Sequence, residues 1–501
     1  MSVSTDDSAA TIDGHIVVIG LATACAAMIA VGAMNEEQPF VAVAALLTIP
    51  AGMFLLARPD SAVPVALFVI YSNAAVVAVR FHGVPSIAAA LAPAPLAIPL
   101  LYNIVLLRKP IVITSTLPWI LAYIGWQTIS AVSSRNPDES IDGVMGVIVE
   151  GLIMYVLITN VIRTPHVLRM AVWGLIAAGA FMGSVSVVQQ STRSFDSNVG
   201  GFGQVSGGKG FKVTEGRAVV QQRRLCGPIG EKNRYAQVML MLVPLALSRF
   251  WSERAKVLQF LALTAAILCG LGCALTFSRS AAIAFMLMLA VGLALRFVSK
   301  RQITFIFAGG LLVLLAVPQY RTRLATVPSA FGLFGTTSVG QEEPDGAIRG
   351  RATEMLAAAR IAVDHPILGV GPDLSSEYTR EYSRVGGFRA LEGSRESHCM
   401  YLEIPAETGI PGIVLFLGML TTSIFSLLRL RQMIDGRNRE FDQTISGFLL
   451  ALTGYLVMGV FLHMSYIRYF WLMLAMADVC AWVVRTSMTE SDGQPLAETV
   501  V

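Results

Sequence analysis

Four segments in the second half of the sequence place basic, amide or imidazole side chains at the borders of long apolar stretches. The first segment, RRLCGPIGEKNRYAQ at 223–237, has Arg224 and Asn233 shortly before such a stretch. We expect Asn233 to cap the helix that begins there. Backbone amides at a helix start, together with a guanidinium, suit an anion. The segment is therefore a candidate anion site, and the alternative is an ordinary basic loop.

The second segment, ALTFSRSAAIAF at 274–285, places Arg279 between two apolar stretches with hardly any turn around it. An arginine costs about 2.5–3.5 kcal/mol at the centre of a bilayer and less near its surface. A short connection between two spans does not require an arginine, so its presence suggests a bound anion or a carboxylate partner. The alternative is an arginine whose stem lies along apolar surface while its charge reaches water.

The third segment, ESHCMYLEIPAETGIPGIVLF at 396–416, contains His398 shortly before another apolar stretch. Histidine is the side chain best suited to exchange protons near neutral pH, which makes His398 a candidate general base. A lone histidine is more often structural than catalytic. Glu407 in the same segment either pairs with an arginine or marks the entry into the apolar stretch, and the second interpretation is favoured.

The fourth segment, RGRATEMLAAARIAVDHPILGVGPD at 349–373, predicts an amphipathic helix over 349–364 and then a tight loop. Arg351 begins the helix and His365 follows its end. The apolar face is assigned to four residues: Met355, Leu356, Ala359 and Ile361. Such a helix rests at a membrane interface or covers a cavity.

The elements that must position these segments are predicted to be membrane-spanning helices. Of 501 residues, 54% are hydrophobic and 14% are charged, and soluble domains have about 25% charged residues. Because the apolar stretches are long and continuous, they predict an all-α polytopic membrane protein with about 14 (12–14) spans and exclude a membrane β-barrel.

The spans and loops divide the chain into six predicted parts. They are N-terminal membrane helices (1–189), a first long periplasmic loop (190–234), central membrane helices with Arg279 (235–319), a long periplasmic loop with the amphipathic helix and His398 (320–404), C-terminal membrane helices (405–486) and a cytoplasmic tail (487–501). The basic residues of the short turns concentrate on one side, so both termini are expected in the cytoplasm and both long loops outside.

Several chemistries find no support in the sequence. A formal net charge of +4 is too small to indicate a nucleic-acid partner. The six cysteines show no zinc or disulfide-scaffold spacing, and no GxxxxGK[ST], HExxH or GxSxG occurs. We therefore expect no metal and no cofactor.

Taken in order, the four segments resemble the O-antigen ligase and O-antigen polymerase family of bacterial inner-membrane glycosyltransferases. The shared pattern is R-x-x-G-x(5)-N, then SRSA, then R-x(13,14)-HP-x-x-G-x-G, then H-x-x-Y/L-x(5)-E-x-G-x-x-G. The likeness covers about residues 215–430, whereas the first seven predicted spans match only as a hydrophobic series.

The resemblance implies a metal-independent enzyme that moves a glycan from undecaprenyl pyrophosphate to an acceptor hydroxyl on the periplasmic side. The acceptor would be lipid A–core for a ligase, another lipid-linked repeat unit for a polymerase of O-antigen or exopolysaccharide, or a Ser or Thr for a protein O-oligosaccharyltransferase. The polymerase is slightly favoured, because fourteen spans exceed the usual number in the ligases. Expected partners are the donor, a glycan or lipid acceptor, membrane lipid and other polysaccharide assembly proteins. The sugar, the linkage and the oligomeric state stay open.

The same resemblance implies the residue roles. His398 is the general base, and Arg224 and Arg279 bind the pyrophosphate, because arginine pairs bidentately with phosphate oxygens and keeps its charge. Arg351 orients the amphipathic helix or contacts sugars. Asn233, Glu407 and His365 are secondary positions.

Two further hypotheses remain beside this one. Cys226 and Cys399 would pair as a disulfide if Arg224 and His398 converge, although two unpaired thiols are favoured. The rival function is a multi-span transporter or flippase of polysaccharide or lipid-linked oligosaccharide, and a receptor or scaffold is a weaker third. A transporter gives no special role to His398.

Overall fold

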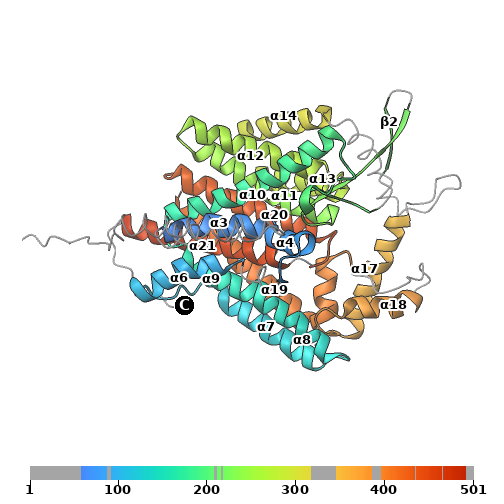
Figure 1. The fold of residues 1–501 in the computed structure, drawn as a ribbon. Coiled ribbons are helices and arrows are strands. Elements are labelled where there is room, and N and C mark those ends of the chain that lie inside the picture. Colours follow the sequence, from blue (N-terminus) through green and yellow to red (C-terminus); the bar gives the residue numbers. More distant parts are fainter. Residues whose placement is uncertain are drawn as a thin grey trace, which may run out of the picture.

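The computed structural model describes residues 58–86, 92–207, 211–215, 218–316, 346–385, 397–434, 436–464 and 467–491. The chain is mostly helical, and its helices pack side by side in one bundle (Figure 1). Among the described residues, six helices are long and apolar enough to cross a membrane, or seven if the bent pair formed by the first two helices is one span. The all-α membrane class is therefore confirmed, whereas the predicted number of spans is not. Two of the predicted spans lie before residue 58, outside the described residues.

The helices follow the chain in this order: α3 (Pro59–Tyr71), α4 (Ala74–His82), η1 (Ala94–Leu96), α6 (Ala97–Leu101), η2 (Tyr102–Leu106), α7 (Leu117–Val132), α8 (Pro137–Gly146), η3 (Val147–Ile153), α9 (Met154–Val161), α10 (Pro165–Thr192), η4 (Val199–Gly201), α11 (Lys232–Ser252), α12 (Lys256–Ala274), α13 (Arg279–Ala294), α14 (Lys300–Ala316), α17 (Gly346–Asp364), α18 (Ser375–Val385), α19 (Met400–Ile434), α20 (Arg439–Gly459) and α21 (Ile467–Ser491).

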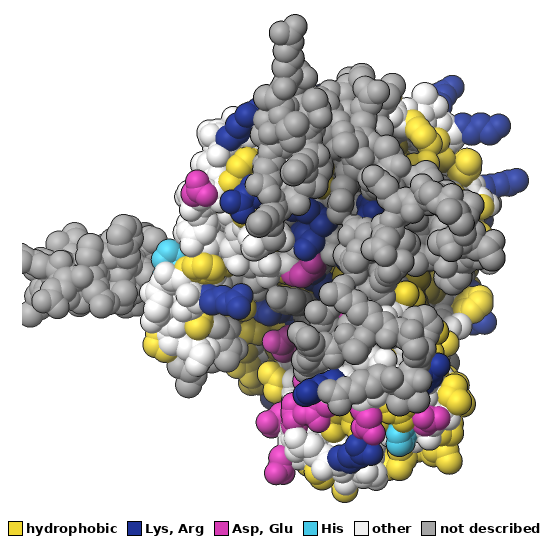
Figure 2. Space-filling view, turned by 90° about the vertical axis from the view of Figure 1, so that its right-hand side faces the viewer, with side chains coloured by type: hydrophobic (Ala, Val, Ile, Leu, Met, Phe, Trp, Pro, Cys, Tyr) yellow, Lys and Arg dark blue, Asp and Glu magenta, His cyan; other side chains and the backbone are white. Residues whose placement is uncertain are grey.

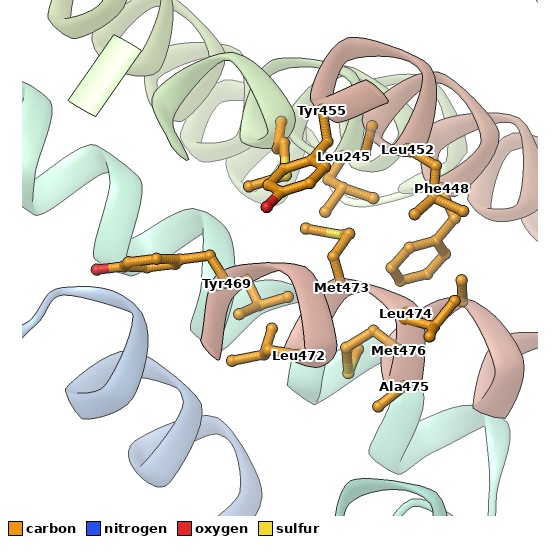
Figure 3. Close-up of a cluster of buried hydrophobic side chains, with 14 of the residues drawn as sticks. Leu245, Phe448, Leu452, Tyr455, Tyr469, Leu472, Met473, Leu474, Ala475 and Met476 are labelled. Atoms are coloured by element: carbon orange, nitrogen blue, oxygen red, sulfur yellow. The ribbon is translucent and has the colours of Figure 1, made fainter. Parts of the chain in front are cut away.

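Helix α11 lies at the centre of the bundle. Its residues from Asn233 to Arg249 are all buried, and it packs against α12 and α20. Apolar side chains of α11, α20 and α21, among them Leu245, Phe448 and Met473, form the core between these helices (Figure 3). Because protein rather than lipid surrounds α11, the helix accommodates charged side chains near both of its ends.

One end of the bundle, called here the Arg249 end, is held by charged contacts between helix termini. Arg249 near the end of α11 donates to Glu440 in the first turn of α20 at 2.9 Å. Arg169 in α10 donates from Nε to Glu253 at 2.9 Å. Arg431 in α19 donates to the carbonyl oxygen of Arg296, after α13, at 2.7 Å. Basic residues that the sequence assigns to the cytoplasm therefore gather at this end.

The opposite end, called here the α17 end, carries the starts of α11, α13, α19 and α21, together with α17 and α18 (right-hand side of Figure 1). The described part of the loop predicted at 190–234 contains four short strands. β1 (Gln204–Val205) pairs antiparallel with β4 (Leu225–Gly227), and β2 (Phe211–Glu215) pairs antiparallel with β3 (Ala218–Gln222).

A helix, α17, spans the segment predicted as amphipathic at 349–364, and its most deeply buried residues share only Ile361 with the predicted apolar face. The most deeply buried residues of α17 are Thr353, Glu354, Ala357, Ala358 and Ile361, and Leu356 is 41% exposed. The prediction that Leu356 lies on the buried face was wrong, because α17 packs against protein through the side that carries Ala358 and Ile361. Its neighbours are α18 and α19 rather than a lipid surface.

A short loop after α17 fastens this helix to a break in α19, and we call this contact the glycine clasp (residues 366–371 with 406–410). The amide of Val370 donates to the carbonyl oxygen of Ala406 at 2.9 Å, and that of Ile410 donates to Pro366 at 2.8 Å. Gly409, with φ 69° and ψ −173°, makes the break. A Cβ at this position would lie 2.0 Å from the carbonyl oxygen of Ile367, so only glycine lets the two segments meet.

Candidate active site

Arg224 connects the first two sequence segments. Its Nε donates to the carbonyl oxygen of Thr276 at 2.8 Å, and its Nη2 donates to Asn233 Oδ1 at 3.3 Å. Ser278 Oγ also donates to Asn233 Oδ1, at 3.0 Å. The R-x-x-G-x(5)-N and SRSA motifs therefore form one hydrogen-bonded group, with the amide of Asn233 at its centre.

Glu231, and not Asn233, is the N-cap of α11. Its carboxylate accepts from the backbone amide of Arg234, and Asn233 Nδ2 donates to Glu231 Oε1 at 3.2 Å. The prediction of Asn233 as the cap was wrong because a carboxylate two residues earlier already satisfies the helix start. The amide of Asn233 instead joins Arg224 to Ser278.

Arg279 is the first residue of α13, and Ser278 is the N-cap of that helix. Ser278 Oγ accepts from the backbone amide of Ala281 at 3.4 Å. Arg279 is half-buried and directly follows the turn that Arg224 holds through Thr276. The structure thus brings Arg224 and Arg279 to the same turn at the α17 end.

His398 lies beside a buried carboxylate. Its Nδ1 is 2.9 Å from Glu354 Oε2, and the side chains are 31% and 3% exposed. The ring of His463 stands at 65° to that of His398, with the centroids 5.9 Å apart. His463 belongs to the connection between α20 and α21. His398 therefore has contacts with α17 on one side and with this connection on the other.

Two consecutive residues of α11 connect the arginine group to the histidine group. Asn233 contacts Arg224, whereas Arg234 Nη2 donates to the carbonyl oxygen of His463. Arg234 Nη1 also donates to Gln237 Oε1 at 2.9 Å. The three distant stretches that contain residues 224, 279 and 398 thus meet at one end of the bundle, around the start of α11.

The basic side chains of Lys232 and Arg234 lie in the first turn of α11, beside the N-cap Glu231. Burial is the main cause that lowers the pKa of the Lys232 ammonium, which precedes the apolar part of the helix. The guanidiniums of Arg224 and Arg351 lower it further, and Glu231 and Cys226 act in the opposite direction. Arg351 on α17 is therefore close enough to Lys232 to influence its charge. In Figure 2, Lys and Arg side chains reach the centre of this face, and acidic side chains gather lower, where Figure 1 places α8 and α18.

His463 is neutral at physiological pH. Burial, with smaller effects from Arg234 and His398, lowers its pKa to about 3. Its ring therefore contributes no positive charge beside His398.

His365 and Glu407 belong to the glycine clasp. The ring of His365 packs edge-on against Tyr378 with the centroids 6.1 Å apart. Glu407 Oε1 accepts from Ser375 Oγ at 2.8 Å, and its carbonyl oxygen accepts from the amide of Gly371 at 3.0 Å. Since His365 follows Glu354 by eleven positions, it lies about 16 Å further along the axis of α17.

The two cysteines of the disulfide hypothesis, Cys226 and Cys399, are both buried free thiols. Burial raises the pKa of Cys226 to about 12, so its thiol is not a nucleophile at neutral pH. Among the described residues, no group of three or more His, Cys, Asp or Glu side chains is placed to hold a metal ion.

Four residues of the site were not singled out from the sequence: Glu231, Arg234, Glu354 and His463. A signal existed for Glu354, because it follows Arg351 by three positions and therefore shares a helix face with it. No local pattern identified Arg234 and His463, whose contact joins positions 229 residues apart.

The fold is that of a helical membrane protein, and the family match that follows points to a glycosyltransferase-like enzyme. Residues 264–417 match the family described as O-Antigen ligase. The match confirms the resemblance to the O-antigen ligase and polymerase family, whose substrates are lipid-linked glycans, and it includes Arg279, Arg351 and His398. A comparison with curated proteins finds no match.

Proposed function

We propose that this protein transfers a glycan from undecaprenyl pyrophosphate to an acceptor hydroxyl at the periplasmic face of the inner membrane. The observation that carries the proposal is the meeting of the Arg224 group and His398 around the start of α11. A pyrophosphate requires fixed cationic donors, and an attacking hydroxyl requires a base. The family match at residues 264–417 supports the same chemistry.

In the proposed reaction, the oxygen of the acceptor hydroxyl attacks the anomeric carbon, and His398 accepts the proton of that hydroxyl. The bond from this carbon to the pyrophosphate oxygen breaks, and the electron pair leaves with the pyrophosphate. Arg224 and Arg279 stabilise the negative charge of this leaving group. Direct displacement inverts the anomeric centre, which analysis of the product anomer tests.

The first test is the replacement of His398. For His398→Ala, we expect transfer in proteoliposomes that hold a lipid-linked glycan donor to fall by about 10²–10⁴-fold, because the base is lost. Donor binding should stay unchanged, whereas the thermal midpoint should fall, because the buried Glu354 carboxylate loses its partner. His166→Ala, at an exposed position before the apolar part of α10, is the matched control. Full transfer by His398→Ala would contradict the proposal and would favour the transporter hypothesis, which gives no role to this histidine.

We propose a second lipid-linked repeat unit as the acceptor, so that the enzyme is a polymerase. The predicted span count that favoured the polymerase includes spans outside the described residues. The reaction product therefore has to distinguish a polymerase from a ligase. A glycan gel of a deletion strain that shows only single repeat units identifies a polymerase. Long chains that stay unattached to lipid A–core identify a ligase.

A further inference from the structure

Glu354 is a buried acid beside the proposed base. Its side chain is 3% exposed, and its Oε2 lies 2.9 Å from His398 Nδ1. A carboxylate removed from water is costly unless a cation or hydrogen-bond donor compensates it. The Nδ1 of His398 lies within ion-pairing distance of this carboxylate. The contact therefore favours the tautomer of His398 that carries its proton on Nδ1.

We propose that Glu354 is a positioning residue for His398, an inference that rests on the proposed function. The carboxylate holds the Nδ1–H, so that Nε2 is the nitrogen that accepts the proton of the acceptor hydroxyl. It also stabilises the imidazolium that forms during the transfer. Glu354 itself exchanges no proton and does not touch the substrate.

The fold holds the carboxylate in place. Glu354 shares the buried face of α17 with Ala358 and Ile361, and the glycine clasp fixes this helix against α19. His398 comes two residues before α19 begins, so the clasp also sets the distance between the two side chains. Glu354 is therefore held on a packed helix, and His398 lies in the bend that leads directly into α19.

Other buried glutamates nearby have different partners. Glu403 Oε2 accepts from the backbone amide of Met464 at 2.6 Å, and Glu407 bonds to Ser375. The second imidazole beside His398, that of His463, is kept neutral by burial and by Arg234. Glu354 is therefore the acid placed to balance the charge that His398 acquires.

The surroundings of His398 determine the sign of the pH effect. Glu354 on α17 and His463 between α20 and α21 face His398, and Arg234 on α11 donates to the carbonyl oxygen of His463. Because burial keeps His463 neutral, the charge that faces His398 through these contacts is that of Glu354. Removal of the Glu354 charge makes the imidazolium that forms during the transfer less favourable, so His398 becomes a weaker base.

The test compares Glu354→Gln with Glu354→Asp in the full-length protein in proteoliposomes. For Glu354→Gln, we expect kcat to fall by about 10- to 100-fold, with KM for the donor within about twofold of wild type. The acid limb of the pH–rate profile should move to lower pH. Glu354→Asp keeps the charge and should recover part of kcat and the wild-type acid limb. Glu381→Gln, which removes an exposed acid paired with Arg135, is the control and should change neither.

The outcomes separate this inference from the proposed function. If His398→Ala abolishes transfer while Glu354→Gln keeps the wild-type kcat and acid limb, the positioning role is wrong and the proposed base stands. If kcat falls equally in Glu354→Gln and Glu354→Asp without a shift of the acid limb, the role is structural and the inference is overturned. If His398→Ala retains transfer, the proposed function itself fails.

Discussion

At the scale of single residues, Arg224 joins two segments that the sequence separates by about fifty positions. Its Nε holds the turn before α13, and its Nη2 holds the start of α11. Nε and Nη2 belong to one planar guanidinium and donate in different directions. A lysine places its charge on a single rotatable ammonium and cannot reproduce this geometry.

We therefore expect Arg224→Lys to lower transfer by about 10²-fold, the size of effect found when a fixed donor to a developing negative charge is lost. The assay is the rate of transfer at saturating donor, with the thermal midpoint measured in parallel. Arg360→Lys, at an exposed position on α17, is the matched control. An Arg224→Lys enzyme with the wild-type rate would exclude a pyrophosphate-binding role that depends on the guanidinium.

The residue types of the site were predictable from the sequence, but their partners were not. Arg224, Arg279 and His398 were identified because a cation or a histidine at the border of a membrane span is costly and often marks a functional site. Glu354 did not, because an acid on an amphipathic helix normally faces water. The contact that gives it a role depends on how α17 packs, and a single sequence does not contain that information.

At the scale of elements, the glycine clasp explains motif residues that carry no reactive group. Gly369, Gly371 and Gly409 all have positive φ, and a Cβ on Gly369 would lie 2.2 Å from the backbone of Glu407. The H-P-x-x-G-x-G and E-x-G spacings thus encode the docking of α17 on α19. The sequence predicted the tight loop, but it assigned His365 and Glu407 to the site.

For Gly409→Ala, we expect a lower thermal midpoint and a lower rate of transfer in the protein that remains folded. The backbone at Gly409 lies in a region that costs of order 1–3 kcal/mol for other residues, and the new Cβ meets a backbone carbonyl. Gly436→Ala is the control, because φ there is 75° and no atom lies within 4 Å of a Cβ. If both variants lost stability and activity equally, the clasp would have no special role.

At the scale of the whole molecule, the later helices alternate in direction, as the hydropathy pattern predicts: α11, α13, α19 and α21 begin at the α17 end, and α20 begins at the Arg249 end. Arginines of the short turns make their contacts at the Arg249 end, and the candidate site lies at the α17 end. Which end faces the cytoplasm stays a prediction. The strands of the 190–234 loop were not predicted: β1 and β4 have only two and three residues, and β3 (AVVQQ) lacks the alternation that marks a strand, although β2 (FKVTE) shows it.

The orientation itself can be tested with single cysteines in a cysteine-free background. A membrane-impermeant maleimide should label Asp138→Cys at the start of α8 in cells with a permeabilised outer membrane, because Ser140 places this helix beside Pro372 at the α17 end. Arg437→Cys, exposed at the Arg249 end, should react only after the inner membrane is opened. The reverse pattern would place the site in the cytoplasm and would exclude a periplasmic reaction.

Asn233 and Arg234 are neighbours on α11, and they contact the Arg224 group and the His398 group respectively. One residue turns an α-helix by about 100° and advances it by about 1.5 Å. A single insertion or deletion in the first turn of α11 would rotate either Asn233 or Arg234 away from its partner. Along this stretch we expect the protein to tolerate exchanges of side chains better than changes of length, because the Arg224 group and the His398 group are contacted by adjacent residues of one helix.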